Sequence, residues 1–263
     1  MKSLCCFLLL LLSLPLRGWT AEIQASDTLL MDAVNLPPVS PYELPYSLTG
    51  RSPDWKRLWV NTGVLAGAFV GTLVVLECLP EDATNWNRAE IQDVPLFKRW
   101  HDHVIKEGPE WDGDKFYFNY ILHPYAGAVY FMSARSCGFN FWQSMLYSTL
   151  ISNVGWEYGI EAFMERPSVQ DMIITPVVGS VIGEGFYRAK RRLVDNDYCL
   201  FGSRVLGGIA AWLIDPVNEF TGLWQGNPAR RAGRRNHQPR GAGLTLLPSS
   251  VPGYPGFTLV GYF

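Results

Sequence analysis

Several hallmarks of well-known protein classes are missing from this sequence of 263 residues. It holds only five cysteines, and none of them form the Cys-x-x-Cys spacing of a redox or zinc motif. It has no G-x-S-x-G, H-E-x-x-H or P-loop sequence, and no G-x-G-x-x-G that follows a strand. The low cysteine count excludes a scaffold built on disulfides. The sequence also carries no motif of the common hydrolase and nucleotide-binding families.

A surplus of basic residues is also missing from most of the chain. Of the 22 basic residues, seven lie in the first 21 or the last 35 positions, which leaves 15 against 24 acidic residues in between and a formal charge of −9. Such a body does not bind nucleic acid through charge. The five arginines after residue 228 lie among Gly and Pro, so a solvated tail is expected, with contact to anionic lipid as the alternative.

The first 21 residues have the layout of a secretory signal peptide. Lys2 gives a basic start, residues 5–14 form an apolar core, and residues 15–21 form a short exit after which we expect cleavage. This core is shorter than the ~20 residues that a membrane-spanning helix needs, and an uncleaved signal anchor is the alternative. The leader predicts export, after which Cys78, Cys137 and Cys199 remain as expected small buried hydrophobes.

The mature chain divides into three parts by composition. Residues 22–54 are rich in Pro and read as an extended lead-in, and residues 55–224 carry helical patterns. Residues 225–263 are rich in Gly, Pro and Arg and show no helical period, although they end in a short strand-like run. We therefore predict an all-α fold, a bundle of five or six helices between the lead-in and an irregular tail.

The most apolar segment of the body is residues 58–79, a predicted helix of 22 residues. Gly63, Gly67 and Gly71 share one face of it, and such a face lets another helix approach closely. We predict that this glycine face packs against a neighbouring helix. By length the segment is either a membrane span or a central helix buried in the bundle.

Polar and ionisable side chains interrupt the apolar helices predicted over residues 115–194. Burying a charge costs several kcal/mol unless it is paired, so we expect these residues to share one buried hydrogen-bonded network that is structural before it is chemical. Its predicted members are Asn119, His123, Arg135, Glu157, Glu161 and Glu184. Because the Glu-x-x-His of di-metal bundles is missing, the sequence favours ion pairs or solvation over a metal, and neither metal nor cofactor is predicted.

A combined pattern of short motifs over about residues 112–217 resembles a known protein family. It consists of N-Y-x-x-H-P-x-x-G-x-x-Y from Asn119, A-R-S-x-G from Ala134, W-E-Y-x-x-E from Trp156, R-P-S-x-x-D from Arg166, T-P-x-x-G-x-x-x-G-E from Thr175, and Asp215-Pro216. The pattern is similar to an uncharacterised bacterial domain-of-unknown-function family of exported Gram-negative envelope proteins. The resemblance implies location in the periplasm or the membrane-associated envelope of a Gram-negative bacterium, and no activity. The pattern stops at about Asn218.

Two functions fit these observations. The first is a non-enzymatic envelope protein, a helical bundle in or against a membrane that binds lipid or a protein partner. The second is a hydrolase or transferase of envelope lipid or glycan that uses His123 with Glu157 or Glu161. No nucleophile motif is present, so we favour the first function, with membrane or envelope lipid as the expected partner.

Overall fold

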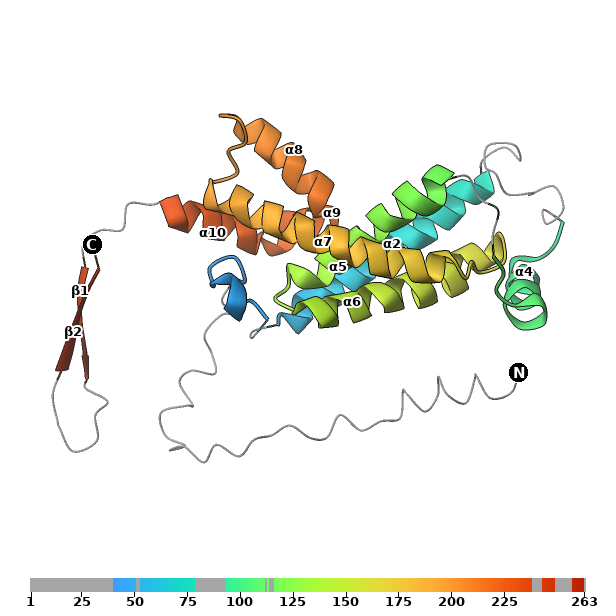
Figure 1. Ribbon diagram of the computed structural model, residues 1–263, viewed down its shortest axis with the longest axis horizontal. Coiled ribbons are helices and arrows are strands. Elements are labelled where there is room, and N and C mark those ends of the chain that lie inside the picture. The colour runs from blue at the N-terminus through green and yellow to red at the C-terminus, as the bar shows by residue number, and fades with distance from the viewer. Residues whose placement is uncertain are drawn as a thin grey trace, which may run out of the picture. The chain divides into compact units, whose positions relative to one another are not determined.

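The computed structural model describes residues 40–50, 53–78, 93–111, 113, 116–237, 243–248 and 257–262 (Figure 1). The predicted signal peptide and most of the predicted lead-in lie outside these residues. In the described body the all-α prediction is confirmed. Eight helices pack together rather than five or six, because two helices follow the last one that the sequence predicts.

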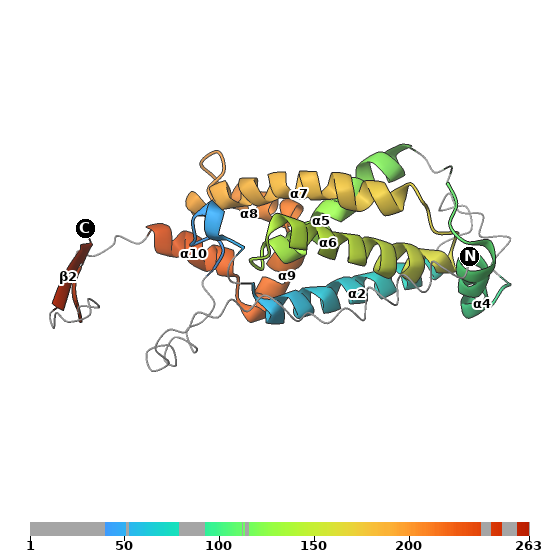
Figure 2. The same cartoon turned by 60° about the horizontal axis from the view of Figure 1, so that its bottom comes forward.

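Four long helical segments form the body of the bundle (Figures 1 and 2). The first is α2 (Trp55–Cys78), and the second is α5 (His123–Arg135), which the π-helical turn η4 (Phe118–Leu122) precedes. The third is α6 (Phe141–Leu150), which continues into the π-helical segment η5 (Ile151–Ile160) and the short 3-10 turn η6 (Glu161–Phe163). The fourth is α7 (Asp171–Asp195). Residues 127–135 of α5 are all buried, so α5 is the central helix.

Side-chain contacts define the directions of the four segments. Asn61 near the start of α2 donates to the carbonyl of Ser133 late in α5, whereas the ring of Phe69 further along α2 makes an edge contact with the earlier Tyr130. These two helices are therefore antiparallel. Ser148 of α6 bonds Gly127 of α5, while the rings of Phe141 and Phe131 meet, so α6 is antiparallel to α5 as well. Helices α5 and α7 run parallel, and the four segments alternate up and down as in a simple bundle.

The closest contact in the bundle joins α5 and α7 through glycines. A Cβ added to Gly127 would lie 1.9 Å from the carbonyl oxygen of Thr175, and one added to Gly179 would lie 2.6 Å from the backbone of Gly127. Gly183 is equally close to the ring of Phe131. Only glycine permits this approach, and it places the polar groups of both helices within reach of one another.

The glycine face of α2 does not pack as predicted. A Cβ added to Gly63, Gly67 or Gly71 would meet nothing within 4 Å, so this prediction is wrong. Instead α2 turns a different stripe inward, in which Leu58, Asn61, Leu65 and Phe69 are buried. This stripe supplies larger apolar side chains than the glycine face, and their burial contributes more free energy. Helix α2 is thus a peripheral helix, and the alternative of a central buried helix for this segment is also wrong.

The remaining helices cap the two ends of the bundle. Helix α4 (Leu96–His101) and the π-helical segment η3 (Asp102–Glu107) lie at the end where α2 finishes, because Arg99 pairs with Glu77 at 2.7 Å. The 3-10 turn η2 (Tyr46–Leu48), α8 (Arg204–Ile214) and α9 (Pro216–Gln225) lie at the other end. There, Arg57 at the start of α2 donates to the side-chain oxygen of Asn218 at 3.2 Å.

The sequence predicted an irregular tail, but the described part of the tail contains regular structure. Helix α10 (Pro228–His237) begins where the side chain of Asn227 caps the backbone N–H groups of Ala229 and Arg230. Strand β1 (Gly243–Pro248) then pairs antiparallel with strand β2 (Phe257–Tyr262), the strand-like run at the end of the sequence. The helical period of α10 is hidden in the sequence because four of its ten positions are arginines and few are apolar.

Candidate functional site

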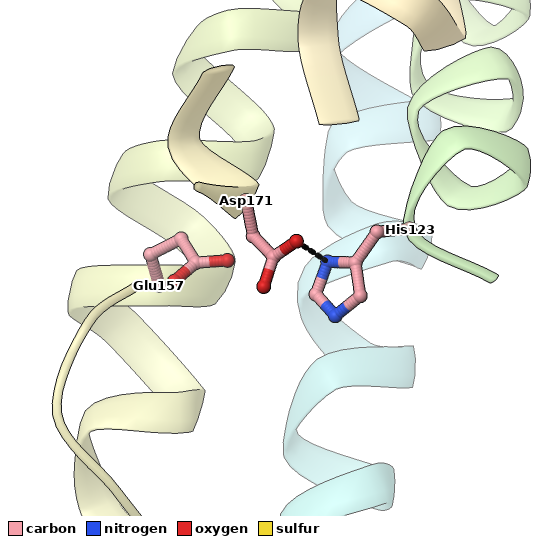
Figure 3. Close-up of side chains that lie close together, drawn as sticks. All are labelled: His123, Glu157 and Asp171. Carbon is pink, nitrogen blue, oxygen red and sulfur yellow. Dashed lines mark ion pairs between the residues drawn. The ribbon is translucent and has the colours of Figure 1, made fainter. Parts of the chain in front are cut away.

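Three helical segments bring His123, Glu157 and Asp171 together (Figure 3). His123 is the first residue of α5, directly after η4, where Pro124 removes one backbone donor. Glu157 lies in η5, whose wider π-helical turns carry the sequence Trp156-Glu157-Tyr158 past the end of α6. Asp171 is the first residue of α7, and its N–H donates to the side chain of Ser168 at 3.1 Å.

The three side chains offer ligand atoms that all lie within 4.8 Å of one another. The Nδ1 atom of His123 is 3.9 Å from Oδ1 of Asp171 and 3.2 Å from the hydroxyl oxygen of Thr175. Glu157 accepts a hydrogen bond of 2.9 Å from the backbone N–H of Ser168. Glu157 and Asp171 are buried and His123 is half-buried, so the group is largely removed from solvent.

A third carboxyl group, that of Glu161, lies beside Glu157 in the following turn η6. Burial raises the pKa of Glu161 well above its usual range, and the carboxylates of Glu157, Glu165 and Asp171 raise it further. The Oε2 atom of Glu161 is buried and has no hydrogen-bond partner among the residues that the structure describes. We refer to His123, Glu157, Glu161 and Asp171 as the acidic-end cluster.

Arg135 and Glu184 form a different cluster. The Nε of Arg135 donates to Glu184 at 2.9 Å, its Nη1 donates to Thr49 and to the carbonyl of Phe139, and its guanidinium lies 4.0 Å from the ring centre of Tyr187. Tyr46 donates its hydroxyl to the other oxygen of Glu184. These contacts join η2 to the bundle. Arg135 therefore pairs with Glu184 and not with Glu157 or Glu161.

The six predicted residues thus divide into two groups instead of forming one network. His123, Glu157 and Glu161 meet at one end of the bundle, with Asn119 buried one helical turn before His123. Twelve positions separate His123 from Arg135 along α5, which amounts to ~18 Å of helix. Because α5 and α7 run parallel, Glu184 lies beside Arg135 at that far end. The prediction of a single shared network was wrong for this reason.

A third buried cluster was missed in the sequence. Lys190 is almost completely buried and pairs with Asp215 at 2.7 Å and with Glu219 at 3.0 Å. Ser136 donates to the same oxygen of Asp215 at 2.6 Å. Burial of Glu219 acts to raise its pKa, but the ammonium of Lys190 outweighs burial and the pKa is lowered. The pairing joins α7, α8 and α9, and it belongs to the structural framework.

Signals for the missed residues were present but pointed elsewhere. Asp171 closes the R-P-S-x-x-D motif, where a helix cap explains it equally well. Lys190 stands in the charged run Arg188 to Arg192, which is typical of a solvated helix end. Asp215 precedes a proline at a helix boundary. Each residue has a local explanation, and only the packing of helices shows its partners.

Residues 108–217 match the model of a protein family described as a domain of unknown function, DUF3943. The matched segment runs from the loop before η4 to the start of α9, and it contains the acidic-end cluster as well as the Arg135–Glu184 pair. Helix α2 lies outside it. No curated protein and no solved structure matches the chain.

Proposed function

We propose that this protein is a non-enzymatic protein of the cell envelope whose helical bundle is embedded in a membrane and binds lipid acyl chains. The observation that carries the proposal is the apolar exterior of the bundle. Large aliphatic side chains on the outer faces of α2, α6, η5 and α7 are exposed: Val70, Val74, Leu146, Leu150, Val154, Val177, Val178 and Val181. Val154 and Val181 are 60% and 67% exposed.

An exterior of this kind is unfavourable in water. Each Å² of exposed apolar surface costs ~25 cal/mol relative to burial, and soluble monomers seldom expose a contiguous apolar patch above a few hundred Å². The interior, by contrast, holds the ionisable residues Arg135, Glu157, Glu184, Lys190 and Asp215. Polar residues inside and aliphatic residues outside are typical of helices that are solvated by lipid.

The dimensions of α2 support the same conclusion. Trp55–Val75 is 21 residues long, and it is the one helix in the described part of the chain that is long and apolar enough to cross a membrane. At 1.5 Å per residue this segment extends ~31 Å, close to the hydrocarbon thickness of a bilayer. Only 22% of its most apolar stretch is buried inside the protein, whereas the core helix of a soluble protein would be mostly buried.

Exposed aromatic residues are concentrated at the two ends of the bundle. Trp55, Trp59 and Trp142 are exposed at the starts of α2 and α6, which lie at the same end. Phe116, Tyr117 and Tyr120 are exposed beside η4 at the opposite end. Trp and Tyr are enriched where a membrane meets water, so the two groups mark the expected boundaries of the lipid-facing zone.

The leader-like sequence of residues 1–21 supports export to the envelope, as does the family resemblance. The alternative function, an envelope lipid or glycan hydrolase or transferase, has the meeting of His123 and Glu157 in its favour. However, Thr175 and Asp171 both face the same ring nitrogen of His123, Nδ1. In a nucleophile–histidine–acid relay the two partners contact opposite nitrogens, so the arrangement favours a non-enzymatic role.

A matched pair of substitutions tests the proposal. Ala66 on α2 and Ala189 on α7 are both exposed alanines within helices. Ala66 lies at the middle of the apolar segment of α2, whereas Ala189 lies among the arginines near the end of α7. In lipid, Ala66→Asp costs roughly 3 kcal/mol and Ala189→Asp costs much less. In water the two substitutions have the same small effect.

We therefore expect wild type and Ala189→Asp to remain in the membrane fraction after alkaline carbonate extraction, and Ala66→Asp to lose most of its membrane-bound yield. Release of the wild-type protein by carbonate without detergent contradicts the proposal. Equal yields and equal melting temperatures of the two variants contradict it as well.

A further inference from the structure

We infer that the acidic-end cluster is a binding site for one divalent first-row transition-metal ion, of which Zn²⁺ and Mn²⁺ are the test ions. His123, Glu157 and Asp171 supply the ligands, and Glu161 lies next to them. The sequence favoured a site without metal because it lacks Glu-x-x-His, but the structure assembles the ligands from three separate segments. The inference goes beyond the proposed membrane role and does not depend on it.

The ligand chemistry selects the class of ion. One imidazole nitrogen and two carboxylates suit Zn²⁺, Mn²⁺ and Fe²⁺, whereas Mg²⁺ and Ca²⁺ prefer sites made of oxygen alone. The side chains come from α5, η5 and α7, so the ion would connect three segments of the bundle. A site held on helices keeps its geometry better than one built on loops.

The distances are close to those of a coordination shell. Around a tetrahedral ion with bonds of about 2.0–2.2 Å, neighbouring donor atoms lie about 3.3–3.6 Å apart. The Nδ1 of His123 and the Oδ1 of Asp171 are 3.9 Å apart, and all three ligand atoms fall within 4.8 Å of one another. Figure 3 shows the imidazole ring and the two carboxylates turned toward one another. Side-chain rotations that move these atoms by about an ångström would bring all three into the shell, with the fourth position left for water.

Two features of the surroundings favour negative charge on the carboxylate ligands. The N–H of Ser168 donates to Glu157 and stabilises its charged form. Asp171 lies at the N-terminus of α7, where the helix dipole also favours a negative charge. Three carboxylates, those of Glu157, Glu165 and Asp171, lie close enough to act on the neighbouring Glu161, so acidic groups are concentrated here. A bound cation lowers the free energy of such a group of buried charges.

Glu161 provides a second, independent indication of a ligand. Its side chain is only 6% exposed, and its Oε2 atom has no hydrogen-bond partner within the described residues. A buried oxygen of this kind costs about 1–3 kcal/mol if it stays unsatisfied. A water molecule bound to the ion beside Glu157 would donate to this oxygen and satisfy it.

The competing occupant of the cluster is a proton. Two buried carboxyls that share one proton also relieve their repulsion, as in aspartic-protease dyads. The two occupants differ in what they predict for the metal-free protein. If a proton alone is shared, added metal binds nowhere at the cluster, and conversion of one acid to its amide leaves the protein equally stable or more stable.

The test uses the full-length protein, purified in detergent with an affinity tag that contains no histidine. After chelation and desalting it is incubated with Zn²⁺ or Mn²⁺, desalted again, and analysed for bound metal by mass spectrometry. The melting temperature is measured with and without the ion. We expect one ion per chain and a higher melting temperature, because an ion that binds only the folded state stabilises it.

Variants locate the site. Asp171→Asn and His123→Ala should each weaken binding by about 100-fold or more, since loss of even a supporting residue around a metal costs 10- to 100-fold. The control is His101→Ala, because His101 is exposed, its Nδ1 lies 3.5 Å from a carboxylate oxygen of Asp102, and it is not among the three ligands. This variant should keep the ion. Wild-type protein that binds no ion and shows no shift in melting temperature overturns the inference, even if a variant fails to fold. Equal binding by wild type and Asp171→Asn overturns it too.

Discussion

At the scale of single residues, burial determines the charge of the acidic-end cluster. Glu157 accepts a hydrogen bond from a backbone N–H, whereas Glu161 lies one turn later, where burial and the neighbouring carboxylates raise its pKa. Two chemically identical side chains therefore have different surroundings within one helical turn. This difference has a direct consequence for the dependence of stability on pH.

Substitution of Glu161 by Gln should remove part of that dependence in the metal-free protein. The pKa of Glu161 is raised in the folded state from its ordinary value of 4.5. A raised pKa contributes stability that is complete below the unfolded value and is lost as pH rises toward the folded pKa. Wild type should therefore lose stability relative to Glu161→Gln as pH rises above 4.5. Melting temperatures recorded across this range test it, and a difference between the two proteins that stays constant with pH contradicts it.

The sequence identified the residue types of the cluster better than their grouping. His123, Glu157 and Glu161 stand out because charged groups are unusual in apolar helices. Their spacing fixes which residues share a face of one helix, but it contains no information on the register between two helices. Arg135 was therefore expected beside Glu157 although it lies ~18 Å further along α5, and Asp171 was considered only as a helix cap.

At the scale of helices, glycine has two different roles in this bundle. Gly127 and Gly179 allow α5 and α7 to touch, while Gly63, Gly67 and Gly71 on α2 face outward with open space around them. In the sequence, Gly179 and Gly183 of α7 show the same four-residue spacing as the glycines of α2. The difference arises because α2 has a competing inward stripe that contains Leu65 and Phe69, which bury more apolar area.

A matched pair of alanine substitutions measures this difference. Gly179→Ala places a methyl group 2.6 Å from the backbone of Gly127, so the two helices must separate, and we expect a loss of ~1–3 kcal/mol in the free energy of unfolding. Gly67→Ala meets nothing within 4 Å and should stabilise α2 by roughly 0.5–1 kcal/mol. Thermal unfolding of both variants provides the test. Equal effects of the two substitutions would show that the close contact of α5 and α7 is not required.

Helix type and number were predicted well within the apolar body and poorly beyond it. The six helices of residues 55–214 follow from apolar periodicity and from start and stop signals. Helix α10 lacks such periodicity, because its arginines leave few apolar positions, and its start depends on the side chain of Asn227. Its position is stabilised by tertiary contacts such as the pair of Arg230 with Glu219 at 2.9 Å.

At the scale of the whole molecule, the bundle has polar clusters at both ends and an aliphatic exterior between them. Helices α2 and α6 run in one direction, and α5 and α7 in the other. If all four segments cross the membrane, the starts of α2 and α6 face one side of it and their ends face the other. The length of α2 alone separates these ends by ~35 Å. Two cysteines lie at these opposite ends.

Cys78 is exposed at the last residue of α2, and Cys199 is half-buried in the loop between α7 and α8 at the other end (Figure 1). They correct the expectation of three buried thiols, which only Cys137 meets. Cys199→Ser retains Cys78 as a reporter of one end, and Cys78→Ser retains Cys199 as a reporter of the other. The double variant measures the background from the remaining cysteines.

The most direct test of membrane embedding is the labelling of these variants with a membrane-impermeant maleimide in sealed spheroplasts of bacteria that express the protein. We predict that one of the two cysteines reacts in sealed spheroplasts, that the other does not, and that both react after lysis with detergent. Reaction of both cysteines before lysis, or of neither, would contradict a bundle that crosses the membrane.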